Sequence, residues 1–78
     1  MKITPSLNDA VTQSLTRYFD ELDGEHPNNL YDLVMQQVEK PMLELVLKET
    51  SNNKSKAADI LGVNRGTLRK KLAQYDLL

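Results

Sequence analysis

The cationic side chains of the C-terminal third are the residues best suited to binding chemistry. Positions 51–78 hold six Lys and Arg residues and two Asp residues, which leaves a net charge of +4; the cations are Lys54, Lys56, Arg65, Arg69, Lys70 and Lys71. Residues 1–50 hold four cations and nine carboxylates, a net charge of −5, so the total of −1 conceals a basic end on an acidic body. This asymmetry indicates a surface that binds a polyanion.

The same basic segment has the pattern of two short helices joined by a tight turn. A helix over 54–61 places Ala57, Ala58 and Leu61 inward, and a helix over 65–74 places Leu68, Leu72 and Tyr75 on one face. A small residue is needed where the helices cross, and Ala58 followed by Gly62 meets that need, with Val63 and Leu68 filling the space between. Two such helices around a glycine turn predict a helix-turn-helix.

The second helix of this motif has the side chains that a DNA major groove requires. Its N-terminal part enters the groove, so Asn64, Arg65, Thr67 and Arg69 are the expected contacts. We assign Arg65 to guanine, since its two donors match the two guanine acceptors, and Asn64 to adenine or phosphate. Thr67, Lys70 and Lys71 are expected to hold the DNA backbone. Gly66, with no side chain, would let the helix approach the duplex closely.

Apolar spacing predicts two longer helices before this motif, over residues 7–22 and 30–50. Ser6 followed by Asp9 resembles a capping box, Asp23 and Gly24 end the first helix, and residues 28 and 29 are asparagines suited to cap the second. The second helix is apolar around much of its circumference, which predicts burial from several sides. A chain of 78 residues has too few other helices for that, so a second copy is expected to cover it. Pro41 inside this helix predicts a kink and not an end, because the apolar spacing resumes after it.

Composition excludes several classes of site. The chain has no cysteine and one histidine, His26, which excludes disulfides and thiolate metal sites. Neither a phosphate-binding glycine loop nor a catalytic constellation is present, so we expect no enzyme activity, no cofactor and no metal. The absence of a long apolar run predicts no membrane span, and the N-terminus has no secretory signal, so the expected location is the cytoplasm.

The run Asn64-Arg65-Gly66-Thr67-Leu68-Arg69-Lys70-Lys71-Leu72 resembles the Fis family of bacterial nucleoid-associated factors. The resemblance extends over residues 30–34 and 39–43 and covers the chain from about Leu7. It implies an all-helical homodimer with a four-helix core and two helix-turn-helix units that bend DNA and compress its minor groove. It also implies degenerate sites with G/C near the ends and an A/T-rich centre. The family's DNA-contacting positions fall on Asn53, Ser55, Lys56, Asn64, Arg65, Thr67, Arg69, Lys70 and Lys71.

The chain departs from the family pattern at several positions. Ser55 stands where threonine is expected, and Lys56 replaces arginine, which keeps the charge and loses bidentate geometry. Ala73 and Gln74 stand where the enteric relative has two lysines, so contacts with flanking DNA are expected to differ from those of the relative. The enteric relative also has an N-terminal hairpin that contacts a DNA invertase, and this chain begins about where that hairpin ends. We therefore expect no stimulation of site-specific inversion.

These observations together predict a single all-α domain over residues 1–78, with dimerisation helices at about 7–50 and the helix-turn-helix at about 54–74. The expected function is that of a homodimeric DNA-bending, nucleoid-associated transcription regulator, with RNA polymerase as a further candidate partner. One alternative is the effector domain of an NtrC-class activator, which ends in a similar dimeric helix-turn-helix. Another is a protein adaptor whose basic helix docks an acidic partner. RNA binding is less favoured, because the four aromatic residues have inward-facing spacings: Tyr18, Phe19, Tyr31 and Tyr75.

Overall fold

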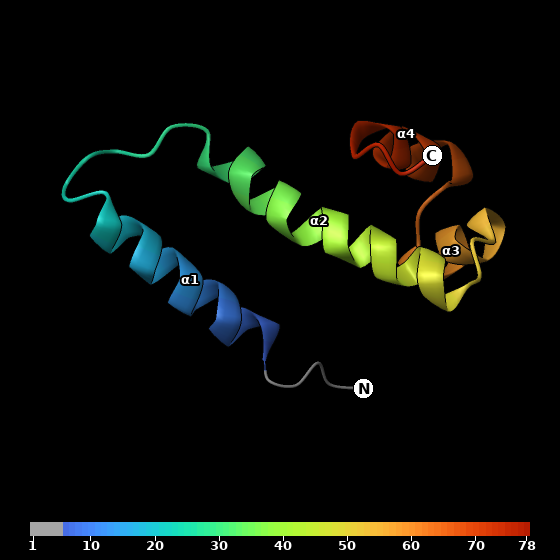
Figure 1. The fold of residues 1–78 in the computed structure, drawn as a ribbon, viewed down its shortest axis with the longest axis horizontal. Helices are drawn as coiled ribbons and strands as arrows, with labels where there is room; N and C mark the ends of the chain where they lie inside the picture. Colours follow the sequence, from blue (N-terminus) through green and yellow to red (C-terminus); the bar gives the residue numbers. More distant parts are fainter. Residues whose placement is uncertain (1–5) are drawn as a thin grey trace. The chain divides into compact units, whose positions relative to one another are not determined.

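The computed structural model describes residues 6–78, and these form four helices. In chain order the helices are α1 (Leu7–Glu21), α2 (Leu30–Glu49), α3 (Lys54–Leu61) and α4 (Arg65–Gln74) (Figure 1). The part of the chain that is described contains no strand, so the predicted all-α class is confirmed. Every helix boundary agrees with the sequence-based prediction to within one residue.

The chain divides into two compact units, Met1–Leu30 and Tyr31–Leu78, and α1 is the helix of the first unit. Its N-cap is Ser6, whose Oγ accepts a hydrogen bond from the backbone N–H of Asp9 at 3.4 Å. The helix closes at Leu22, and left-handed backbone begins already at Asp23 (φ 52) and continues at Gly24 (φ 88).

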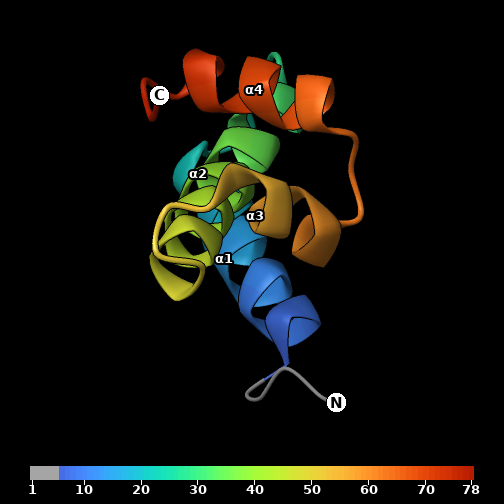
Figure 2. The same ribbon diagram turned by 90° about the vertical axis from the view of Figure 1, so that its right-hand side faces the viewer.

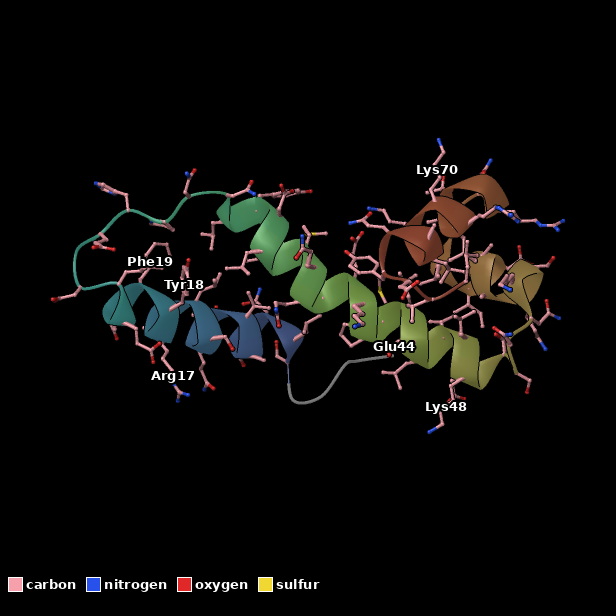
Figure 3. The ribbon with its side chains drawn as sticks, turned by 45° about the horizontal axis from the view of Figure 1, so that its top comes forward. Arg17, Tyr18, Phe19, Glu44, Lys48 and Lys70 are labelled. Carbon is pink, nitrogen blue, oxygen red and sulfur yellow. The ribbon has the colours of Figure 1, made fainter. Side chains whose placement is uncertain are left out.

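The aromatic side chains of α1 lie on its apolar side. Tyr18 and Phe19 are in edge-to-face contact with ring centroids 5.9 Å apart, and Arg17 points the other way (Figure 3). Phe19 is nevertheless 46% exposed, and no residue of α1 is buried within the single chain. The predicted apolar stripe therefore exists, and its side chains are not buried within the described part of the first unit.

The core of the second unit forms where α2, α3 and α4 meet. Leu43 of α2 is buried against Ala57 and Ala58 of α3 and against Leu68 and Leu72 of α4. Val46, Leu47, Leu61, Tyr75 and Leu77 pack around this cluster. The two C-terminal helices lie one above the other and are joined by the turn at residues 62–64 (Figure 2). The inward positions predicted for both helices are confirmed.

Four of the eleven apolar residues of α2 are exposed, and six more are only half-buried. Only Leu43 of this helix is fully buried, whereas Leu45 is 59% exposed and Tyr31 is 76% exposed. Of the four aromatics with inward-facing spacings, Tyr31 and Phe19 are both exposed. The helix continues through Pro41, as the resumed apolar spacing predicts.

The connections before α2 and α3 depend on asparagine and serine in left-handed conformations. Asn29 has φ 65, which is not the extended backbone of an N-cap residue, so the predicted cap of α2 does not form at this position. Ser51 (φ 53) and Asn52 (φ 66) follow the end of α2 in left-handed backbone. The hydroxyl of buried Thr50 donates to the backbone carbonyls of Val46 (2.9 Å) and Leu47 (3.2 Å).

None of the helices within residues 6–78 combines the length and the apolar composition needed to cross a membrane.

Candidate nucleic-acid interface

Two of the predicted contact residues, Asn53 and Asn64, are the N-caps of the helix-turn-helix. The Asn53 Oδ1 accepts from the backbone N–H of Lys56 at 3.1 Å. The Asn64 Oδ1 accepts from two backbone N–H groups, those of Gly66 at 2.7 Å and Thr67 at 3.2 Å. Both asparagines have the extended backbone of a cap residue, with ψ of 101 and 149. These bonds satisfy helix donors that would otherwise lack a partner.

The cap bonds bear on which of its two expected partners, adenine or phosphate, Asn64 can contact. An asparagine that reads adenine must accept a hydrogen bond with its carbonyl oxygen and donate one with its amide nitrogen. In Asn64 the carbonyl oxygen already accepts two bonds, which fills its two lone pairs. The Nδ2 donor remains, and a phosphate oxygen needs only a donor. The geometry therefore favours the phosphate role over the adenine role.

The two sides of α4 differ in burial. Leu68 and Leu72 are buried at 2% and 0% exposure and attach the helix to the core. Arg65, Thr67, Arg69 and Lys70 are all exposed on the rest of the helix. Figure 3 shows the Lys70 side chain pointing away from the helices of its unit. In α3, Ser55 and Lys56 are exposed in the first turn.

Lys71 differs from the other predicted cations because a carboxylate of its own chain holds it. Its Nζ lies 3.0 Å from Oε2 of Glu39 on α2 and 3.4 Å from Oε1 of the same residue. The Tyr75 hydroxyl donates to that Oε1 at 2.5 Å. Glu39 thus links two residues of α4 to α2. This cluster could not be predicted from the sequence. Glu39 is 32 residues from Lys71 and 36 residues from Tyr75, and helical periodicity relates only residues a few positions apart.

The Glu39 cluster also changes proton affinities. The hydrogen bond from Tyr75, together with the bond and charge of Lys71, lowers the pKa of the Glu39 carboxyl below its usual 4.5. The same hydrogen bond raises the pKa of the Tyr75 hydroxyl to about 12, because the phenol donates only while protonated. At neutral pH the Glu39 carboxylate is therefore charged and the Tyr75 hydroxyl is protonated.

The structure gives Gly62 a conformational role and Gly66 a steric role in the turn. The sequence pattern suggests that Gly62 provides space at the helix crossing, but a Cβ there would meet no atom within 4 Å. Its φ of 72 is the requirement, because L side chains disfavour this left-handed C-cap conformation. A Cβ on Gly66 would lie 3.1 Å from the Asn64 Oδ1, so this glycine leaves space for the cap.

One core prediction for the turn is wrong. The sequence predicts that Val63 fills the space between the two helices, yet this residue is 40% exposed. Leu68 fills that space, and Leu77 packs beside the core from beyond the end of α4. Since Gly62 reverses the chain in a left-handed conformation, the residue that follows it is directed away from the core.

Comparison with known proteins gives the same assignment for most of the chain. The model of the bacterial regulatory protein, Fis family, matches residues 34–75. A Fis-like DNA-binding protein of Ralstonia nicotianae is 56% identical over 68 residues, which span 87% of this chain and 88% of that protein. The DNA-binding proteins Fis of Pasteurella multocida and Histophilus somni are 51% and 49% identical over 71 residues, 91% of this chain and 72% of theirs. With these matches over the helix-turn-helix and the helix before it, the chain belongs to the Fis family of bacterial regulatory proteins.

Proposed function

We propose that the chain forms a homodimer that binds duplex DNA through α3 and α4, bends it, and regulates transcription as part of the bacterial nucleoid in the cytoplasm. The observation that carries this proposal is the exposed cationic surface of α4 on a helix fixed from behind by Leu68 and Leu72. A rigid support of this kind allows short side chains to reach base edges in a fixed register. The names of the relatives, which describe DNA-binding proteins, support the same conclusion.

The roles of the side chains follow from their positions on the motif. Arg65 is the first residue of α4 and is exposed, so it is the residue we assign to a guanine edge. Asn53 and Asn64 keep free amide donors beside their caps, and Ser55, Lys56, Thr67, Arg69 and Lys70 complete the set that grips phosphates. Lys71, already paired with Glu39, is the weakest member of the predicted set.

The dimer is proposed from the exposed apolar side chains of α1 and α2. Leu33, Met42 and Leu45 of α2 are between 39% and 59% exposed, and Leu7 and Phe19 of α1 are exposed as well. Leaving this much apolar area in water is unfavourable by about 25 cal/mol per Å². A second copy that covers these side chains would join residues 1–78 into one domain. It would also present two α4 helices to one duplex, which is how dimers of this motif read two half-sites.

The test is a salt titration of duplex binding with a matched pair of arginine variants. The duplex has G/C near its ends and an A/T-rich centre, and the comparison duplex has random sequence. Arg65→Ala should cost about 1–3 kcal/mol on the specific duplex and much less on the random one. Arg17→Ala removes an exposed arginine from α1 and should leave both affinities unchanged.

The salt dependence separates this proposal from the adaptor alternative. Neutralising phosphates releases counterions, so affinity should fall steeply as salt rises. Weak duplex binding that is indifferent to Arg65→Ala would exclude sequence readout by α4 and favour docking of an acidic protein. Bending is measured separately on the same complexes, by fluorescence energy transfer between labels at the two duplex ends. The transfer should rise when the protein binds, because bending brings the ends closer together.

A further inference from the structure

A hollow lined by three cations lies beside the exposed face of α4. Lys54, the first residue of α3, lines it together with Arg65 and Arg69, which are one turn apart on α4. Gly66, Leu68 and Leu72 complete its wall. Its volume is about 210 Å³. A water molecule in the liquid occupies about 30 Å³, so the hollow accommodates a group of several heavy atoms.

The charge of the hollow is uncompensated within the described chain. No carboxylate belongs to its lining, and the ion pair found within residues 6–78 joins Lys71 to Glu39, outside the hollow. Three like charges around one space repel each other, so an anion placed there gains attraction from all three. The buried Leu68 and Leu72 close one side to water, which strengthens those attractions.

We propose that this hollow seats one backbone phosphate of the duplex, held by Lys54 and Arg69. Lys54 is not among the contact residues predicted from the sequence, and its role appears only when α3 and α4 are placed together. The inference rests on the proposed DNA binding and names a further residue for it. A phosphate contact positions the protein without reading sequence, whereas the neighbouring Arg65 can reach a base edge.

The experiment compares Lys54→Ala with wild type in salt titrations on the specific and the random duplex. Loss of one phosphate contact should reduce the magnitude of the slope of log affinity against log salt by about 0.9. The ratio of wild-type affinity to Lys54→Ala affinity should therefore be about threefold larger at 50 mM salt than at 200 mM salt. The loss should be equal on the two duplexes, so their affinity ratio stays unchanged. Lys54→Arg should keep the wild-type slope, because it keeps the charge.

Lys48→Ala is the matched control, since Lys48 is an exposed lysine on α2 outside the hollow (Figure 3). It should leave the slope unchanged. If wild type binds the duplex with a steep salt dependence and Lys54→Ala has the wild-type slope, the phosphate seat is disproved and the proposed function stands. If wild type shows no salt-dependent duplex binding, both fail.

Titration with inorganic phosphate, followed by NMR of the protein, tests whether the hollow serves a free anion. At constant ionic strength, the seat predicts that phosphate competes with DNA more strongly than chloride does, and that this difference disappears in Lys54→Ala. Tight phosphate binding at Lys54 without any competition would overturn the proposal in favour of a site for a free anion.

Discussion

Glu39 is the residue on which the attachment of α4 to α2 depends most directly. Its carboxylate accepts from the Tyr75 hydroxyl and pairs with Lys71, and its side chain is only 15% exposed. A carboxylate with two such partners is stabilised in its charged form, which is why its pKa is lowered. It also holds a lysine that lies in the basic segment, so the number of cations free to meet phosphate is smaller than the sequence alone indicates.

The pKa shifts predict a pH dependence of folding stability with a defined sign. Because the pKa of Glu39 is lower in the folded state, its contribution is present above its usual value near 4.5 and is lost as the pH falls through the folded pKa. Because the pKa of Tyr75 is raised to about 12, its contribution is present below its usual 10.0 and is lost as the pH rises through about 12.

Glu39→Gln should therefore lower the free energy of unfolding at neutral pH and make the loss of stability below pH 4.5 less steep. Urea denaturation at a series of pH values measures this directly. Glu44→Gln, which removes an exposed carboxylate from the same helix, is the comparison. Parallel profiles for wild type and Glu39→Gln in acid would show that the cluster does not contribute to stability in solution.

At the scale of the elements, the caps between α3 and α4 decide where α4 begins. Asn53 starts α3, Gly62 ends it, and Asn64 starts α4 two residues later. The Gly62 N–H donates to Asp59 at 3.2 Å, and the Val63 N–H donates to Ala58 at 3.1 Å, which closes the helix through left-handed backbone. A change at this turn moves α4 relative to α3, and with it the exposed cations.

Gly62→Ala is expected to destabilise the fold by about 1–2 kcal/mol, because a residue with a Cβ is disfavoured in the left-handed region. No atom lies within 4 Å of the added Cβ, so the cost is one of backbone conformation and not of a clash. Gly62→Asn should cost less, since asparagine tolerates this conformation. Chemical denaturation of both variants is the measurement. Equal losses for the two would indicate that the turn depends on something other than φ.

At the scale of the whole molecule, the uncovered apolar residues predict that stability depends on concentration. A protein whose second copy covers Leu33, Met42 and Leu45 gains stability as dimers form, so its melting temperature rises with protein concentration. Leu45→Glu places a charge at the 59% exposed position on α2 and should raise the dimer dissociation constant more than about tenfold, or 1.4 kcal/mol.

Sedimentation equilibrium measures the dimer prediction, with Glu44→Gln as an exposed neighbour that should leave the dissociation constant unchanged. A monomer at all accessible concentrations would contradict the proposed dimer. It would also leave the apolar side chains of α1 and α2 without an explanation from self-association.

Local rules are sufficient for the helices and for part of the candidate site. The Asn64 cap involves groups two and three residues away, and the Gly62 turn involves its own φ, so the sequence near each position contains the information. The inward positions of Ala58 and Leu72 follow from helical periodicity alone. Charge separation is likewise a property of the sequence, which is why the order of residues suffices to locate the basic end.

Contacts between distant residues could only come from the tertiary structure. The pairing of Glu39 with Lys71 and the meeting of Lys54 with Arg69 depend on how three helices cross, and no spacing along the chain determines a crossing. The exposure of Val63 likewise depends on the direction in which the turn leaves α3. The helices, most of their caps and the location of the positive charge thus follow from the order of residues. Which cations are free and which are held follows from the packing of the helices, because charges act over distances in space and not along the chain.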